Sequence, residues 1–205
     1  EVMKASVLLG LDESKSRSGL TGGDAAKLDR YIQSGKTLSD HTVLTAAKNA
    51  IAVNEHNAKM GLVCATPTAG SAGCLPAVLT SAIEKLGLSE GEQLNFLLAA
   101  GAFGLVIANN ASISGAEGGC QAEVGSASAM SAAALVLAAG GSPFQASQAI
   151  CFVIKNMLGL ICDPVAGLVE VPCVKRNAMG ASYAFIAADM ALAGIESKIP
   201  VDEVI

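Results

Sequence analysis

Three cysteines are the residues of this chain whose type and surroundings could do chemistry. Cys120 lies in the segment GGCQAEVG, and Cys162 and Cys173 form the two ends of the segment CDPVAGLVEVPC. Both segments are rich in Gly, Pro and small residues, so the backbone can bend around a ligand there. Three thiolates brought together suit an iron–sulfur cluster with one iron left open, and an open metal ion can act as a Lewis acid.

A simpler interpretation is that the three cysteines are unrelated thiols buried in a core, because free cysteine is among the most buried residue types. The separations of 42 and 11 residues match no short metal motif such as C-x-x-C. From these residues alone, both interpretations stay open.

The composition favours closely packed helices and argues against nucleic-acid binding. The 205 residues suffice for one large domain or two small ones. Hydrophobic residues make up 52% of the chain but aromatic residues only 3%, so Ala, Val, Leu and Ile supply the apolar surface. The net charge is −5 and there is no basic run, which argues against nucleic acid as a partner.

The apolar segments predict neither a membrane span nor a leader. The longest apolar run, 96–108, is shorter than the roughly 20 residues that cross a bilayer. The N-terminal segment EVMKASVLLGLDESK does not read as a signal peptide. Six cysteines without a secretory signal indicate reduced thiols and a cytoplasmic location. Because the chain opens on Glu1 rather than Met, we expect a fragment of a longer chain.

The hydrophobic pattern predicts an all-α fold, a compact helical bundle forming a single domain over residues 1–205. Asp40 or Ser39 can cap the first clear helix, and Gly87 can end the second. No alternating strand pattern of convincing length is present. We expect the third helix to be the most buried. The expected helices span 43–60, 76–86, 90–107, 122–139, 142–158 and 182–193.

Four polar, glycine-rich segments separate these helices, at 18–27, 64–74, 109–125 and 162–182. Loops of this kind ahead of helix N-termini offer N–H groups to a carboxylate or a phosphate. None is a Walker A loop, because GSAGCLP lacks the Gly-Lys-Ser/Thr ending. Any one of them could be a simple turn. Since two hold the candidate cysteines, we expect the loops to converge on one cluster site.

At these loops the sequence resembles the α subunit, or catalytic domain, of iron–sulfur-dependent L-serine dehydratases. The resemblance is carried by SGLTGGDA, CATPTAGSAG, ANNASISGAEGGCQAEVG, CDPVAGLVEVPCVKRNAMGAS and AADMALAGI. These strings are long and run from near the first residue to the last. The resemblance implies that Cys120, Cys162 and Cys173 hold a 4Fe–4S cluster whose fourth iron is open to substrate.

The resemblance also implies a lyase that converts L-serine to pyruvate and ammonia without pyridoxal phosphate. The cluster would bind the serine hydroxyl and make it a better leaving group. For the substrate carboxylate we predict donors in the loops. The TGGD segment at 21–24 is a second candidate for that role. The predicted substrate-binding residues are Thr66, Thr68, Ser71 and Asn110.

The sequence departs from the family in ways that bear on its partners. The family uses a second α/β domain or β subunit with a Ser-Ser-His-Thr motif, and no such motif occurs here. Val201 stands where close relatives often have Cys. The expected partners are therefore L-serine and a cognate β subunit or α/β domain, with self-association left open. In an aerobically prepared fragment we expect the cluster to be absent.

No base for the α-proton is apparent. His56 falls within an expected helix and His41 beside a helix cap, so a base from the partner domain fits better. Lys175 and Arg176 could offset a negative cluster or be solvated. Two rival functions stay open: an iron–sulfur L-cysteine desulfidase, and a non-catalytic helical scaffold whose cysteines bind zinc or nothing.

Overall fold

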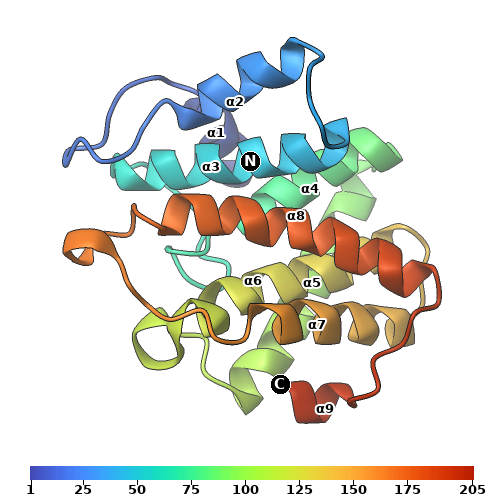
Figure 1. Ribbon diagram of the computed structural model, residues 1–205. Coiled ribbons are helices and arrows are strands. Elements are labelled where there is room, and N and C mark those ends of the chain that lie inside the picture. The colour runs from blue at the N-terminus through green and yellow to red at the C-terminus, as the bar shows by residue number, and fades with distance from the viewer.

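The computed structural model describes all 205 residues and confirms the all-α fold. It contains no strand, and nine α-helices and one short 3-10 helix follow one another along the chain (Figure 1). Their bounds are α1 Val2–Leu9, α2 Asp24–Gln33, α3 His41–Ala58, α4 Cys74–Leu86, α5 Glu90–Asn110, α6 Gly115–Ala138, α7 Pro143–Met157, η1 Val165–Gly167, α8 Cys173–Leu192 and α9 Val201–Val204.

Helix α6 forms the centre of the main core. It packs against α4, α5, α7 and α8, and every residue from Val124 to Val136 is buried. Most of these residues are Ala, Ser or Gly, so neighbouring backbones can approach from several sides. One contact is polar: the Ser128 hydroxyl donates to the carbonyl oxygen of Gly180 on α8. Small side chains thus let α6 be surrounded without leaving gaps.

Helix α3 organises the other side of the molecule, where it packs against α1, α2, α4 and α8. The chain leaves α1 at Gly10, which lies directly on the α3 backbone. A Cβ added at Gly10 would stand 1.9 Å from the carbonyl oxygen of Ala52. Only glycine allows this crossing, so Gly10 sets how closely α1 packs on α3.

Several predicted helix ends are confirmed by their caps. The Asp40 side chain accepts a hydrogen bond from the Thr42 N–H at the start of α3. Gly87 ends α4 in the left-handed conformation, with φ of 69°. Ser89 and Ser142 each close a capping box at the start of α5 and α7.

The start of the last long helix was predicted wrongly. Helix α8 begins at Cys173 rather than at residue 182, so half of the expected loop 162–182 is helical. The polar residues of this stretch favour a loop when they are considered locally. However, Val174, Asn177 and Ala181 are buried at helical spacing, and their packing selects the helix. Helices α1 and α2 were not predicted.

The expectation that the helix from Glu90 would be the most buried is also wrong. Only Phe96, Ala100 and Ile107 of α5 are buried, and Leu98 and Leu105 are each 62% exposed. The helix is apolar around its whole circumference but packs mainly on α6. Its outer face therefore has no neighbouring helix, which apolar content alone could not reveal.

The exposed apolar face also gives α5 the composition of a membrane span. The helix has 21 residues, and its most apolar window has a mean hydropathy of 1.4 with 17% of that window buried. By length and composition alone it could cross a bilayer. One such helix is weak support for membrane insertion.

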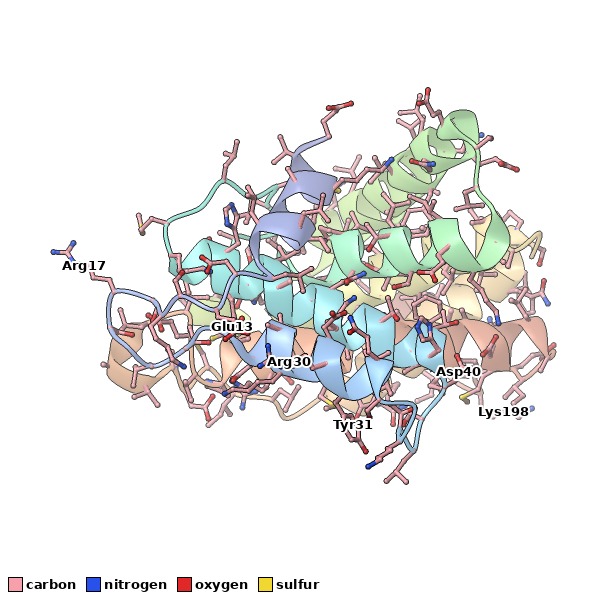
Figure 2. All side chains as sticks on the ribbon, turned by 90° about the horizontal axis from the view of Figure 1, so that it is seen from above. Glu13, Arg17, Arg30, Tyr31, Asp40 and Lys198 are labelled. Carbon is pink, nitrogen blue, oxygen red and sulfur yellow. The ribbon has the colours of Figure 1, made fainter.

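The glycine-rich loops gather at one end of the bundle, on the left in Figure 1. The loop between α1 and α2, the loop before α4, the start of α6 and the loop before α8 all lie there. Figure 2 shows Arg17 extending away from the body at this end, while Glu13 pairs with Arg30 of α2. The predicted convergence of the loops is therefore present.

Candidate active site

Three helical stretches begin at cysteines at the loop end of the molecule. Helix α4 starts at Cys74 and α8 at Cys173. Helix α6 is broken at Gly119, where φ is 78° and ψ is −178°, so its straight part begins at Cys120. A Cβ at Gly119 would stand 2.7 Å from the Leu160 carbonyl oxygen, so glycine is required at this break. Helix N-termini stabilise negative charge, which favours thiolates and anionic ligands at this end.

Arg176 connects the three cysteines predicted to bind a cluster. Its Nη1 donates to Cys120 Sγ at 3.2 Å, to the Ile161 carbonyl oxygen at 3.0 Å and to Asp163 Oδ1 at 2.5 Å. The last two residues flank Cys162, and Arg176 itself lies one turn after Cys173 on α8. Sequence reasoning left Arg176 undecided between a site residue and a solvated one. In the structure, Arg176 joins the loop of Cys162 to α6, which carries Cys120, and to α8, which carries Cys173.

The thiol pKa values show that these groups influence one another. Burial is the main cause that raises the pKa of Cys173 to about 11, and the charges of Cys120 and Glu123 contribute to this rise. Burial also raises the pKa of Cys120 and outweighs the hydrogen bond from Arg176, while the charge of Cys162 adds to the rise. Both thiols are therefore protonated near neutral pH, and metal binding would have to displace their protons.

The donor set suits a thiophilic metal group, but the three thiols do not form a closed coordination shell. All six cysteines are free. Cys120 and Cys173 are 3% and 8% exposed, whereas Cys162 is exposed on the loop before α8. No group of three or more ligating side chains is close enough to hold one metal ion. The three thiols therefore do not meet at a single ion, as a mononuclear metal site would require.

The loop 64–73 lies against this site through Thr68. The Thr68 hydroxyl donates to Glu123 Oε1, one helical turn after Cys120, and accepts from the Ser71 N–H at 3.2 Å. Ser71 is fully buried, and its hydroxyl stays within the loop, with the Thr66 carbonyl oxygen 3.4 Å away. Two of the predicted substrate residues thus shape the loop. The N–H groups of Ala69 and Gly70 donate to no backbone acceptor, so they are free to bind a ligand.

Asparagine side chains fix the loop 64–73 to two helices. Asn177 of α8 donates to the Gly70 carbonyl oxygen at 2.8 Å and accepts from the Gly73 N–H at 3.2 Å. Asn54 of α3 donates to the same Gly70 oxygen at 3.2 Å. Sequence reasoning missed both residues. The only sign of their role in the sequence is that a polar residue occupies a position on the buried face of a helix.

Asn110, in contrast, forms no hydrogen bond with the loop 64–73. It ends α5, is exposed, and donates to the Val106 carbonyl oxygen of its own helix at 2.7 Å. Its predicted role in substrate binding stays a prediction. Thr66 is half-buried, and its hydroxyl donates to the Cys64 carbonyl oxygen at 3.4 Å.

The TGGD segment binds a carboxylate, but that carboxylate belongs to the chain. Glu55 of α3 is fully buried and accepts from the N–H groups of Gly22 at 3.1 Å and Asp24 at 2.9 Å. The Thr21 hydroxyl lies 3.5 Å from the same carboxylate. These donors are therefore committed to Glu55, and the segment is an anchor for the start of α2.

Two further charged groups have structural partners. Lys175 pairs with Asp24 at 2.5 Å, which ties the start of α8 to α2. Glu170 is buried and accepts from Ser16 at 2.6 Å and from Ser18 at 2.9 Å. It therefore links the loop before α8 to the loop after α1.

Comparison with known proteins shows the family of this chain. The family described as "Serine dehydratase alpha chain" matches residues 1–205, the whole chain. This chain belongs to that family. It is 65% identical over 204 residues to the probable L-serine dehydratase alpha chain of Bacillus subtilis, covering 100% of this chain and 68% of that protein.

Two further relatives show how the family varies in length. The L-serine dehydratase alpha chain of Peptoniphilus asaccharolyticus is 47% identical over 206 residues, covering 100% of this chain and 70% of that protein. L-serine dehydratase 2 of Escherichia coli is 42% identical over 216 residues, again covering 100% of this chain but 47% of that protein. The segment described here therefore corresponds to part of a larger protein in some relatives.

Proposed function

We propose that this chain is the cluster-bearing part of an iron–sulfur L-serine dehydratase. The observation that carries the proposal is the convergence of Cys120 and Cys173 at two helix N-termini, with Arg176 holding the loop of Cys162 beside them. Family membership over the whole chain supports the same reaction. Cys120, Cys162 and Cys173 would hold the cluster, which would supply Lewis-acid activation of the serine hydroxyl.

The chain's own residues would position the substrate for the loss of water. The free N–H groups of the loop 64–73 and the N-terminus of α4 favour the carboxylate of L-serine. Arg176 would offset negative charge near Cys120. Loss of the α-proton and the β-hydroxyl gives aminoacrylate and water. Aminoacrylate then becomes an imine, which water hydrolyses to pyruvate and ammonia.

No residue of this chain is placed as the base for the α-proton. The ring of His56 packs on Gly61, and its pKa is lowered by burial. His41 stands 3.4 Å from Thr45 at the start of α3. We therefore assign the base to a partner subunit or domain. Because removing a general base typically costs 10²–10⁴ in rate, the chain alone should have weak activity at most.

Anaerobic reconstitution with iron and sulfide tests the proposal. The wild-type chain should bind both and gain broad, air-sensitive visible absorption, whereas Cys162→Ala should lose both the absorption and pyruvate formation with the cognate partner. Cys151→Ala is the matched control, because Cys151 is buried on α7 and its thiol faces the Ile199 carbonyl oxygen. Tight zinc binding without iron uptake would favour a metal-binding scaffold. Turnover of L-cysteine in preference to L-serine would favour a desulfidase.

A further inference from the structure

Glu123 is a carboxylate in the candidate active site that has no cationic partner. It lies on α6, one turn after Cys120, and its Oε1 accepts from the Thr68 hydroxyl. Neither oxygen lies within ion-pair distance of a Lys, Arg or His. The second oxygen, Oε2, accepts no hydrogen bond from the protein. It is not completely buried either. Oε2 therefore keeps some contact with solvent.

The backbone makes space for this carboxylate on two sides. A Cβ added at Gly70 would stand 2.6 Å from Glu123 Oε1, and a Cβ added at Gly115 would stand 2.6 Å from Oε2. The loop before α4 and the first residue of α6 thus approach the carboxylate at glycines, where no side chain intervenes. Oε1 is fixed by Thr68, so the direction of Oε2 is fixed as well. A carboxylate held this way is oriented for a ligand.

The charge of Glu123 is unbalanced in its surroundings. It raises the pKa values of Cys74, Cys120 and Cys173, so it lies near the helix N-termini of the site, although burial is the larger cause for each thiol. The two cations of this region bind groups other than Glu123: Arg176 binds Asp163 and Cys120, and Lys175 binds Asp24. A carboxylate that has no cationic partner in the protein gains most from a cation supplied by the ligand.

We propose that Glu123 binds the α-ammonium group of the substrate and thereby selects an amino acid over other β-hydroxy acids. This inference rests on the proposed function. The ammonium and the hydroxyl of L-serine are on adjacent carbons, so groups that bind them must be near one another, as Glu123 and Cys120 are. An ammonium has three donors and needs acceptors, and an ionised acceptor gives the stronger bond. The carboxylate of the substrate then points to the loop 64–73.

The test compares two ligands on the reconstituted enzyme with its partner. The ligands are L-serine and 3-hydroxypropanoate, which is L-serine without the ammonium group. Binding is measured by titrating the change in the visible spectrum of the cluster, and KM and kcat are measured for L-serine. The wild-type enzyme should bind L-serine far more tightly. In Glu123→Gln, which keeps the size and an acceptor for Thr68, affinity for L-serine should fall about 10- to 100-fold.

The remaining outcomes overturn the inference, and each one points to a different explanation. Equal weakening of both ligands in Glu123→Gln would indicate a structural role, and a lower kcat with unchanged serine affinity would indicate a base. A wild-type enzyme that does not discriminate between the ligands overturns the inference without any variant. If the wild-type protein binds no cluster and forms no pyruvate, the proposed function fails as well. Glu84→Gln, an exposed position on α4, should leave every value unchanged.

Discussion

The loop end and the helical body of this molecule are stabilised in different ways. In the body, α6 is surrounded by other helices, and its buried residues are mostly Ala and Ser. At the loop end, the chain is fixed by buried polar groups such as Glu55, Glu170 and Asn177, each bound to a segment distant in sequence. The body therefore depends on shape, whereas the loop end depends on hydrogen bonds. The loop end therefore combines a backbone fixed by buried side chains with N–H groups, such as those of Ala69 and Gly70, that have no backbone acceptor.

The largest effect should follow from removing the Glu55 carboxylate. In Glu55→Ala, the N–H groups of Gly22 and Asp24 lose their acceptor in a buried place. Leaving buried donors unsatisfied costs about 1–3 kcal/mol each, so the free energy of unfolding should fall by about 4 kcal/mol. Urea unfolding followed by circular dichroism measures the change.

The control for this prediction is Glu84→Ala, at an exposed position of α4. It should change the free energy of unfolding by less than about 0.5 kcal/mol. Equal stability of Glu55→Ala and wild type would show that the loop end does not depend on its buried carboxylate.

A smaller effect is expected from adding volume to the helical body. Ala132 of α6 is fully buried among neighbouring helices, and Ala132→Leu would force them apart. Overpacking of this kind costs about 1–3 kcal/mol. The matched control is Ala102→Leu on the exposed face of α5, which should be close to neutral. The two variants differ only in their surroundings, so similar losses of stability would contradict the role assigned to small residues in α6.

The sequence was sufficient to predict features that depend only on a residue and its neighbours in the chain, such as helix ends. Asp40 as a cap and Gly87 as a helix end follow from the side chain and the backbone conformation of single residues. The gathering of the glycine-rich loops was also predicted correctly. Cys120 and Cys173 lie together at that end, although their closure with Cys162 around a cluster stays a prediction.

The sequence was not sufficient to predict features that depend on packing between distant segments, such as which helix is most buried. The apolar helix α5 looks more like a core helix than the Ala-rich α6, but Leu98 is exposed and Ala132 is buried. Composition gives the apolar surface of a helix and not the number of helices packed on it. Glu123 could have been noticed, since three residues after Cys120 is the same helix face. Glu55 could not, because its partners are more than 30 residues away in sequence.

The smallest effect concerns Asp24, a partly buried charge beside the Glu55 anchor. Hydrogen bonds from Lys175 and Lys27 lower the pKa of Asp24 to about 2, below its usual 3.8. A lowered pKa in the folded state means that the ionised carboxylate stabilises the fold above about pH 4, and this contribution is lost between about pH 4 and pH 2. Solvent screening reduces the contribution to about 1 kcal/mol. Asp24→Asn should therefore be less stable than wild type at pH 7 by about that amount, and the difference should vanish by about pH 2. Denaturant unfolding of both proteins across this range measures it, and a difference that persists at pH 2 would mean that Asp24 acts through hydrogen bonding and not through charge.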